Sequence, residues 1–180
     1  MKYLARTMVM LGVLALVAPA AAQAEDESVA AIEQANDAAF DARLAMVEAF
    51  AEGTLENGKF LWKDDTTAVD RLVLSLSDQM IYAYDGDHLV GVSTVSTGRE
   101  GRETPAGTFK IIAKHRYYRS KKYDNAPMPY MQQITSYGVA RHAGPMTGYP
   151  ASHGCIRLPP QFAANLFAAT HIGIPVLITP

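Results

Sequence analysis

The sequence predicts a mainly β protein, a sandwich or barrel-like fold with a few helices and one further helix near the N-terminus. Apolar residues alternate with other side chains over residues 72–77, which is the period of a strand that buries one face. The pair Asp85-Gly86 separates two further strand-like runs, and Asp-Gly in that position is a strong hairpin signal. Apolar residues at helical spacing occur mainly in residues 28–52 and 159–169.

The helix predicted over residues 28–52 contains neither Gly nor Pro and is followed by Gly53 as a stop signal. We expect it either to pack on the main domain or to form a mobile stalk. Residues 53–67 are interpreted as a linker, with the apolar triplet 60–62 anchored to the domain. The strands expected after the linker cover residues 72–77, 80–84, 89–95, 108–113, 137–141 and 176–179.

The first 24 residues have the three-part pattern of a cleaved secretory signal. Lys2 and Arg6 are positive, residues 8–20 are almost wholly apolar, and Ala22-Gln23-Ala24 is a small-x-small cleavage pattern. A membrane anchor is the alternative, but the apolar run is shorter than the ~20 residues that a spanning helix needs. We therefore expect an exported protein that is cleaved after residue 24 and keeps no stable membrane span.

Removal of that signal leaves 156 residues with a net charge of −4, which is enough chain for one compact domain. The acidic balance argues against nucleic acid as a partner, since nucleic acid requires a basic patch. Cys155 is the only cysteine, so it forms no internal disulfide in an oxidising compartment. A lone thiol of this kind is either a buried inert residue or a nucleophile.

The reactive side chains concentrate in residues 141–158, R-H-A-G-P-M-T-G-Y-P-A-S-H-G-C-I-R-L. A thiol attacks as the thiolate and is usually activated by a histidine. His142 lies at the end of a predicted strand, and the loop that follows can return Cys155 to face it, which makes His142 the better general base. His153 lies two residues before the cysteine, and a sharp turn at Gly154 would make the backbone N–H groups converge into an oxyanion hole.

Two other interpretations of these residues stay open. His142, His153 and Cys155 could bind zinc, although no CxxC, HxxxH or nearby carboxylate reinforces such a site. Alternatively, the cysteine is buried only for packing. The basic loop of residues 114–122 is either a solvated face or a surface that meets acidic glycan peptides. Its tyrosines, Tyr117, Tyr118 and Tyr123, either line a substrate groove or belong to a packed loop.

The hexapeptide Ser152-His153-Gly154-Cys155-Ile156-Arg157, preceded by a histidine, resembles the signature of the L,D-transpeptidase catalytic domain family, the YkuD-like cysteine transpeptidases of peptidoglycan. Other segments resemble the family in the same order along the chain, and the whole match spans residues 70–179. They are the strand pair 72–84, the S-T-G…T-P-x-G-x-F segment 96–109, the M-P-Y motif 128–130 and the closing strand 173–178. The resemblance implies a catalytic domain over residues 68–180.

The resemblance also implies roles for individual residues. Cys155 is the nucleophile, His142 is the base and the carbonyl of Ala143 holds the histidine ring. The amides of His153, Gly154 and Cys155 form the oxyanion hole, and His153 shapes the site. Substrate-binding roles fall to Met128 and Tyr130 in the donor cleft, to Ser152 and Ala143 beside the nucleophile, and to Arg157, whose guanidinium suits a stem carboxylate. Only nine residues separate His142 from Ser152, fewer than is usual in the family, which implies a small lid.

The function implied is a periplasmic transferase that needs no cofactor or metal. Its cysteine attacks the third residue of a peptidoglycan tetrapeptide stem, D-alanine leaves, and an amine accepts the acyl group, either from a second stem or from an envelope protein. An L,D-carboxypeptidase or amidase would use the same thioester with water as acceptor. A non-enzyme alternative is a peptidoglycan-binding module with an inactive site.

Overall fold

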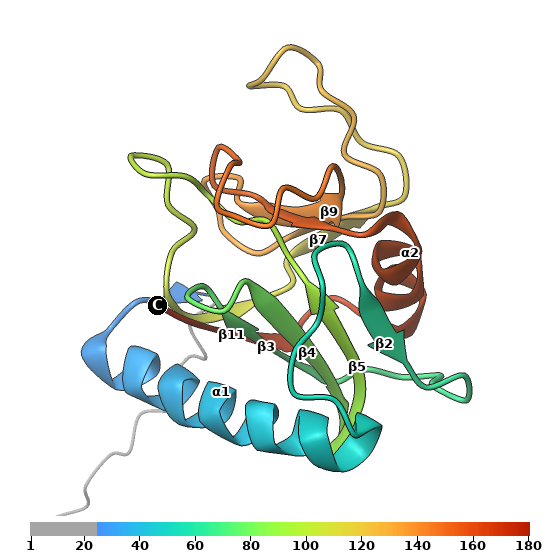
Figure 1. Ribbon diagram of the computed structural model, residues 1–180. Coiled ribbons are helices and arrows are strands. Elements are labelled where there is room, and N and C mark those ends of the chain that lie inside the picture. Colours follow the sequence, from blue (N-terminus) through green and yellow to red (C-terminus); the bar gives the residue numbers. More distant parts are fainter. Residues whose placement is uncertain (1–24) are drawn as a thin grey trace, which may run out of the picture.

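The structure is a computed structural model that describes residues 25–180; the predicted signal sequence lies outside the described residues. Two sheets and two helices make up the fold (Figure 1). A seven-stranded sheet has the order β1-β6-β11-β3-β4-β5-β2, and a four-stranded sheet has the order β10-β9-β8-β7. The elements are β1 (Glu25–Asp26), α1 (Val29–Phe50), β2 (Phe60–Trp62), β3 (Arg71–Ser75), β4 (Met80–Asp85), β5 (His88–Thr94), β6 (Gly107–Lys110), β7 (Ala113–His115), β8 (Met131–Gln133), β9 (Ala140–Ala143), β10 (Ile156–Leu158), α2 (Pro160–Ala169) and β11 (Pro175–Thr179).

The larger sheet is built around the β3–β4–β5 meander that the alternating pattern predicted. The turn between β4 and β5 contains Gly86 at φ 57°, a left-handed conformation that glycine adopts without steric cost. The closing strand β11 runs parallel to β3 and antiparallel to β6. Both of its neighbours are therefore supplied by earlier parts of the chain, and β11 completes the middle of the sheet.

The main core lies between the two sheets and continues under α2. It includes Leu74 and Ile81 from the large sheet, Ile156 from the small sheet and Phe162 from α2, all at most 1% exposed. Trp62 packs edge-on against Phe162, with ring centroids 5.5 Å apart. This apolar layer fixes the small sheet, and with it the reactive stretch of the sequence, over one face of the large one.

Helix α1 covers the opposite face of the large sheet (Figure 1). Ser28 caps its N-terminus by accepting from the Ala31 amide, as Ser prefers to do at this position. Small residues at helical spacing let the helix approach the sheet closely, and Met46 fills the space at the C-terminal end. The buried face comprises Ala31, Ala35, Ala39, Ala42 and Met46.

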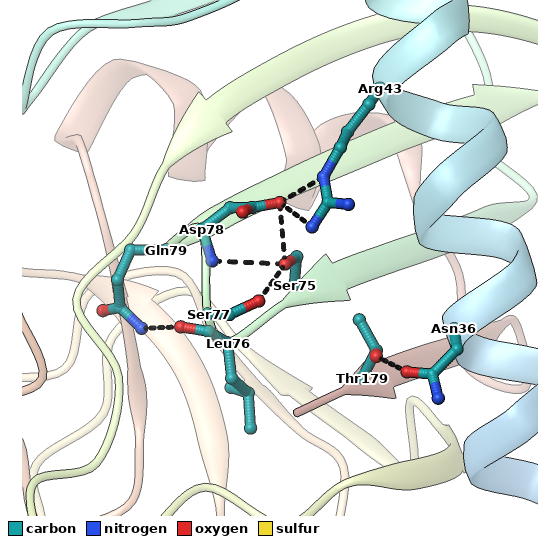
Figure 2. Close-up of polar contacts among 8 residues, drawn as sticks. All are labelled: Asn36, Arg43, Ser75, Leu76, Ser77, Asp78, Gln79 and Thr179. Atoms are coloured by element: carbon teal, nitrogen blue, oxygen red, sulfur yellow. Dashed lines mark hydrogen bonds and ion pairs between the residues drawn. The ribbon is translucent and has the colours of Figure 1, made fainter.

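Polar contacts also join α1 to the sheet (Figure 2). Arg43 pairs with Asp78 in the turn after β3, and Asp78 in turn accepts from the Ser75 hydroxyl at 2.9 Å. Thr179, at the end of β11, donates to the Asn36 side chain. Of the two alternatives for this helix, the structure therefore has it packed on the domain.

The expected linker differs from the structure in one respect. Residues 60–62 form β2, the edge strand that pairs antiparallel with β5. Three residues are too few to display a period, so the strand was not visible as a pattern. Strands β7, β8 and β10 are equally short, and the run expected over residues 108–113 is divided between β6 and β7.

Within residues 25–180, neither helix has the length and apolar character needed to cross a membrane.

Met46 tests the packing of α1. It is 1% exposed, so Met46→Ala should lower the free energy of unfolding by about 2–5 kcal/mol through lost burial and the cavity left behind. Val47 is 54% exposed on the next position of the same helix, and Val47→Ala should change it by no more than about 0.5 kcal/mol. Equilibrium urea unfolding measures both. Equal effects would contradict the packing described.

Candidate active site

The parallel pairing of β9 and β10 brings the reactive residues together. Arg157 is the register partner of His142, and Ile156 is the partner of Arg141. Because side chains alternate along a strand, His142 and Arg157 project to one face, and Arg141 and Ile156 project to the other. Cys155 comes immediately before β10, two residues from Arg157, and so lies on the His142 face.

The turn that delivers the cysteine is held by Ser152 and Gly154. Gly154 has φ 110°, a conformation that L side chains rarely adopt. The Ser152 hydroxyl accepts from the Gly154 amide at 3.1 Å and donates to the Cys155 carbonyl at 2.5 Å. Thr104, from another segment of the chain, also stabilises the turn, since its hydroxyl donates to the Gly154 carbonyl at 2.9 Å. Cys155, the predicted nucleophile, therefore stands on a turn whose polar groups are engaged, here called the nucleophile turn (residues 152–155).

A second segment, residues 96–99, braces this turn. The Thr97 carbonyl accepts from the amides of Ala151 and Ser152, each at 2.9 Å. Thr97 is itself held by Gln79, whose side chain accepts from the Thr97 amide at 3.0 Å and donates to its hydroxyl at 2.7 Å. Figure 2 shows the further bond from Gln79 to the Leu76 carbonyl. A continuous chain of hydrogen bonds thus runs from the β3–β4 turn to the nucleophile turn.

A pocket of about 620 Å³ opens over these residues. Its wall combines the reactive face of β9 and β10, the nucleophile turn and the loop between β7 and β8. Four cations and one acid line it: Arg102, Lys121, Lys122, Arg157 and Glu103. The apolar wall next to the thiol includes Met128 and Met131, which form a small cluster with Ala140 and Cys155.

The protonation state of His142 follows from its contacts. The Nδ1 atom lies 2.8 Å from the Ala143 carbonyl oxygen. A carbonyl only accepts, so the proton is assigned to Nδ1 and the lone pair to Nε2. Burial lowers the pKa of His142 below its ordinary value; the Ala143 bond opposes this shift and the charge of Arg157 adds to it. At neutral pH the ring is therefore neutral and can accept a proton.

The thiol is neutral as well. Burial raises the pKa of Cys155 above its ordinary value, while a hydrogen bond from the Ala140 backbone and the charges of Arg157 and Lys122 act in the opposite direction. The arrangement is a neutral thiol and a neutral imidazole on one wall of a pocket. Such a pair can generate a thiolate when the proton passes from sulfur to nitrogen.

Comparison with known proteins identifies this arrangement. The family model of the L,D-transpeptidase catalytic domain (YkuD) matches residues 69–178. The chain belongs to this family. L,D-transpeptidase 1 of Mycobacterium tuberculosis H37Rv is 29% identical, over 51% of this chain and 50% of the relative. The chain thus spans about half the length of the curated relatives it matches.

Solved L,D-transpeptidases have the same fold. One from M. tuberculosis H37Rv is 26% identical with a TM-score of 0.58, and the match covers 63% of this chain and 58% of that one. L,D-transpeptidase 3 of the same species, solved with a faropenem-derived adduct, is 25% identical with a TM-score of 0.56, covering 63% and 60%. The mainly β fold expected from the sequence is confirmed.

Most of the residues that the sequence singled out as site residues lie around one pocket. Its lining includes Cys155, His142, His153, Gly154, Ser152, Arg157 and Met128. The Ala143 carbonyl contacts the histidine ring as the resemblance implied. Gly144 lies against the Arg157 side chain, where an added Cβ would come within 3.2 Å of Cγ. The absence of a side chain at Gly144 therefore leaves room for the side chain of Arg157.

Two residues are placed differently from the expected arrangement. Tyr130 does not line the pocket: its φ is 57°, and its ring packs against Phe167 of α2 with centroids 5.8 Å apart. The Gly154 amide is occupied by the Ser152 hydroxyl, which leaves the amides of His153 and Cys155 as candidates for an oxyanion hole. His153 turns outward and stacks on Tyr123 at 4.6 Å. In residues 25–180 no group of three His, Cys, Asp or Glu side chains is placed to hold a metal ion.

Sequence reasoning missed the contacts that close the pocket. The Arg102 guanidinium donates to the Tyr123 hydroxyl at 3.2 Å, and Tyr123 in turn covers His153. The loop between β7 and β8 thereby reaches the nucleophile turn. Tyrosines and cations in residues 114–123 were visible in the sequence, but their partners lie elsewhere in the chain. Only the folded structure identifies them.

The pKa of Cys155 can be tested by alkylation. Iodoacetamide reacts with the thiolate, and burial raises the pKa of this thiol above its ordinary value of 9.0. The alkylation rate of the native protein should therefore still be rising above pH 9. The urea-unfolded protein, with the same single cysteine, serves as control and should level off earlier. A native plateau at or below pH 7 would indicate a standing thiolate and contradict this result.

Proposed function

We propose that this chain is an exported cysteine L,D-transpeptidase that transfers acyl groups between peptidoglycan stem peptides in the periplasm. The observation that carries the proposal is the neutral pair of Cys155 and His142 on one wall of the pocket, with the Nδ1 proton of the ring directed to Ala143. Membership of the family supports the peptidoglycan stem as substrate. The predicted signal in residues 1–24 supports export.

In the first half-reaction, Nε2 of His142 takes the thiol proton and Sγ attacks the carbonyl carbon of the third stem residue. The negative charge moves to the carbonyl oxygen, where the amides of His153 and Cys155 are candidates to stabilise it. The C–N bond then breaks, and the nitrogen of D-alanine leaves with the proton from His142. A thioester on Cys155 remains. Because that proton is taken and returned by the same ring, the half-reaction leaves both residues neutral.

In the second half-reaction, an acceptor amine attacks the thioester carbon and transfers a proton through His142 to the departing sulfur. A new amide bond forms and the thiol is restored. The amine belongs to a second stem peptide or to an envelope protein. Four cations in the pocket wall suit a substrate that carries carboxylates, and Arg157 lies next to the reactive pair as register partner of His142.

Water in place of the amine would make the protein an L,D-carboxypeptidase or, with a protein-linked stem, an amidase. The loop between β7 and β8 favours the transferase, because Tyr123 over His153 and the apolar residues near the thiol give an acceptor larger than water a surface to contact. A binding module with an inactive site would retain the pocket but form no thioester.

The proposal is tested by intact-mass spectrometry of residues 25–180 incubated with a tetrapeptide-bearing muropeptide. We expect an adduct that lacks D-alanine, followed by a dimeric muropeptide. Cys155→Ala should give neither. Release of free tripeptide without dimer would indicate a carboxypeptidase and not a transferase. If the folded protein forms no adduct with this donor but is still acylated by a penem, the proposed donor is wrong. The cysteine would then still be a reactive nucleophile.

Gln79 should act as a positioning residue for this reaction, because it does not line the pocket and holds Thr97, which braces the nucleophile turn. Gln79→Met keeps the length of the side chain and removes these bonds. We expect kcat for thioester formation to fall about tenfold, which corresponds to ~1.4 kcal/mol, with KM unchanged. Gln161→Met, on the exposed surface of α2, is the matched control and should leave both constants unaltered.

Both variants are compared with the unsubstituted protein well below their melting temperatures, so that the folded fraction is the same. A rise in KM with unchanged kcat would assign Gln79 to substrate binding instead. No change in either constant would show that the nucleophile turn keeps its position without this brace.

A further inference from the structure

A second hollow adjoins the active-site pocket on the loop between β7 and β8. It has a volume of about 330 Å³ and is lined by Tyr117, Tyr118, Arg119, Pro127 and Pro129, here called the tyrosine groove. Tyr118 and Pro127 also line the larger pocket. The two hollows therefore share a wall and lie next to each other.

The groove is held open by backbone pairing across the loop, which rises above the small sheet as the yellow-to-orange segment of Figure 1. The Met128 amide donates to the Tyr118 carbonyl at 2.9 Å, and the Ser120 amide donates to the Ala126 carbonyl at 2.9 Å. Arg119 and Pro127 form a bridge between these bonds, and the Arg119 side chain donates to the Asn125 carbonyl at 2.9 Å. The groove walls are thus opposite strands of one ladder.

Tyr117 gives the groove its chemical character. Its side chain is 85% exposed, the highest value among the large apolar residues of residues 25–180. Its neighbour Tyr118 is engaged with the ring of His115 at 5.5 Å. An aromatic face open to water beside two prolines offers apolar contact, and the tyrosine hydroxyls and the Arg119 guanidinium offer hydrogen bonds.

This combination suits a saccharide. A pyranose ring presents C–H groups on its faces, which pack on aromatic rings, and hydroxyl or acetamido groups around its rim, which need polar partners. The groove volume lies at the lower end of the range for small-molecule sites, which combine aromatic walls with a few polar groups. No carboxylate lines the groove, so the polar side chains there are donors from Arg119 and hydroxyls from the two tyrosines.

The structure of the proposed donor substrate sets how far a saccharide lies from Cys155. The third stem residue reacts, so two residues separate it from the sugar that carries the stem. The reacting carbonyl is at the far end of the third residue, so three extended residues, or at most about 10 Å, separate it from the linkage to the sugar. The sugar therefore lies beyond the immediate surroundings of Cys155, and the adjoining hollow that shares Tyr118 and Pro127 with the pocket is a candidate to hold it.

We propose that the tyrosine groove binds the amino sugar to which the donor stem is attached, with Tyr117 stacked on its ring. The proposal rests on the function proposed above and adds the saccharide to the recognised part of the donor. The groove makes the protein prefer stems on glycan over free peptides.

The test compares thioester formation from a disaccharide-tetrapeptide with that from the free tetrapeptide, without acceptor. The unsubstituted protein should have a kcat/KM about tenfold higher for the disaccharide form, which is the size of one good aromatic contact. Tyr117→Ala should bring the ratio close to one and leave the free tetrapeptide unaffected, whereas Tyr117→Phe should keep the ratio. Tyr149→Ala, at a tyrosine that is 61% exposed and outside both hollows, is the matched control and should also keep it.

An unchanged ratio in Tyr117→Ala would overturn the proposal. A sugar effect confined to the transfer step would assign the groove to the acceptor and overturn it as well. Binding of the peptide-free disaccharide to Cys155→Ala, followed by NMR, separates the two proposals. If that binding depends on Tyr117 while the unsubstituted protein forms no thioester, the saccharide site is retained and the transpeptidase is rejected. Absence of that binding, with free tetrapeptide still reacting, would retain the enzyme and count against the groove.

Discussion

The parallel register between β9 and β10 is the constraint on which the site depends. It makes Arg157 the partner of His142 and directs Cys155 to the same face two residues earlier. A shift of β10 by one residue would exchange its faces: Ile156 would enter the pocket and Arg157 would enter the core. The register is therefore fixed by burial, since Ile156 is 1% exposed and packs in the core between the sheets.

Arg141 lies on the same face as Ile156 and is also excluded from solvent. The residue is fully buried, and one bond joins its guanidinium to the Gln132 side chain at 2.7 Å. Desolvation lowers its pKa to about 9, so the side chain stays charged at neutral pH. The single ion pair found in residues 25–180 joins Arg43 and Asp78, so no acid compensates Arg141 there. A charge buried in this way is costly.

Sequence alone was sufficient for elements long enough to display a period. Helix α1, the β3–β4–β5 meander, α2 and β11 were visible because burial on one face dictates the spacing of apolar residues. Strands of three residues, such as β2 and β10, have no period, and pairing with a distant partner decides their state. The same distinction applies to the site. Cys155 and His142 were recognisable by chemistry, whereas the displacement of Tyr130 depends on its positive φ and on the position of α2.

The neutral state of the Cys155–His142 pair determines at which stage of the reaction the charged and polar groups of the site can act. Burial raises the pKa of the thiol and lowers that of the imidazole, so both shifts oppose a standing ion pair. Arg157 lowers both pKa values, which favours the thiolate and disfavours the imidazolium, and thus does not stabilise the pair as a whole. Charge separation becomes favourable only when the negative charge has moved on to a carbonyl oxygen near backbone amides. Interactions that strengthen at that moment lower the barrier without stabilising the resting enzyme. The exposed ring of His153 stacks on Tyr123, which supports His142 as the ring proposed to move the proton.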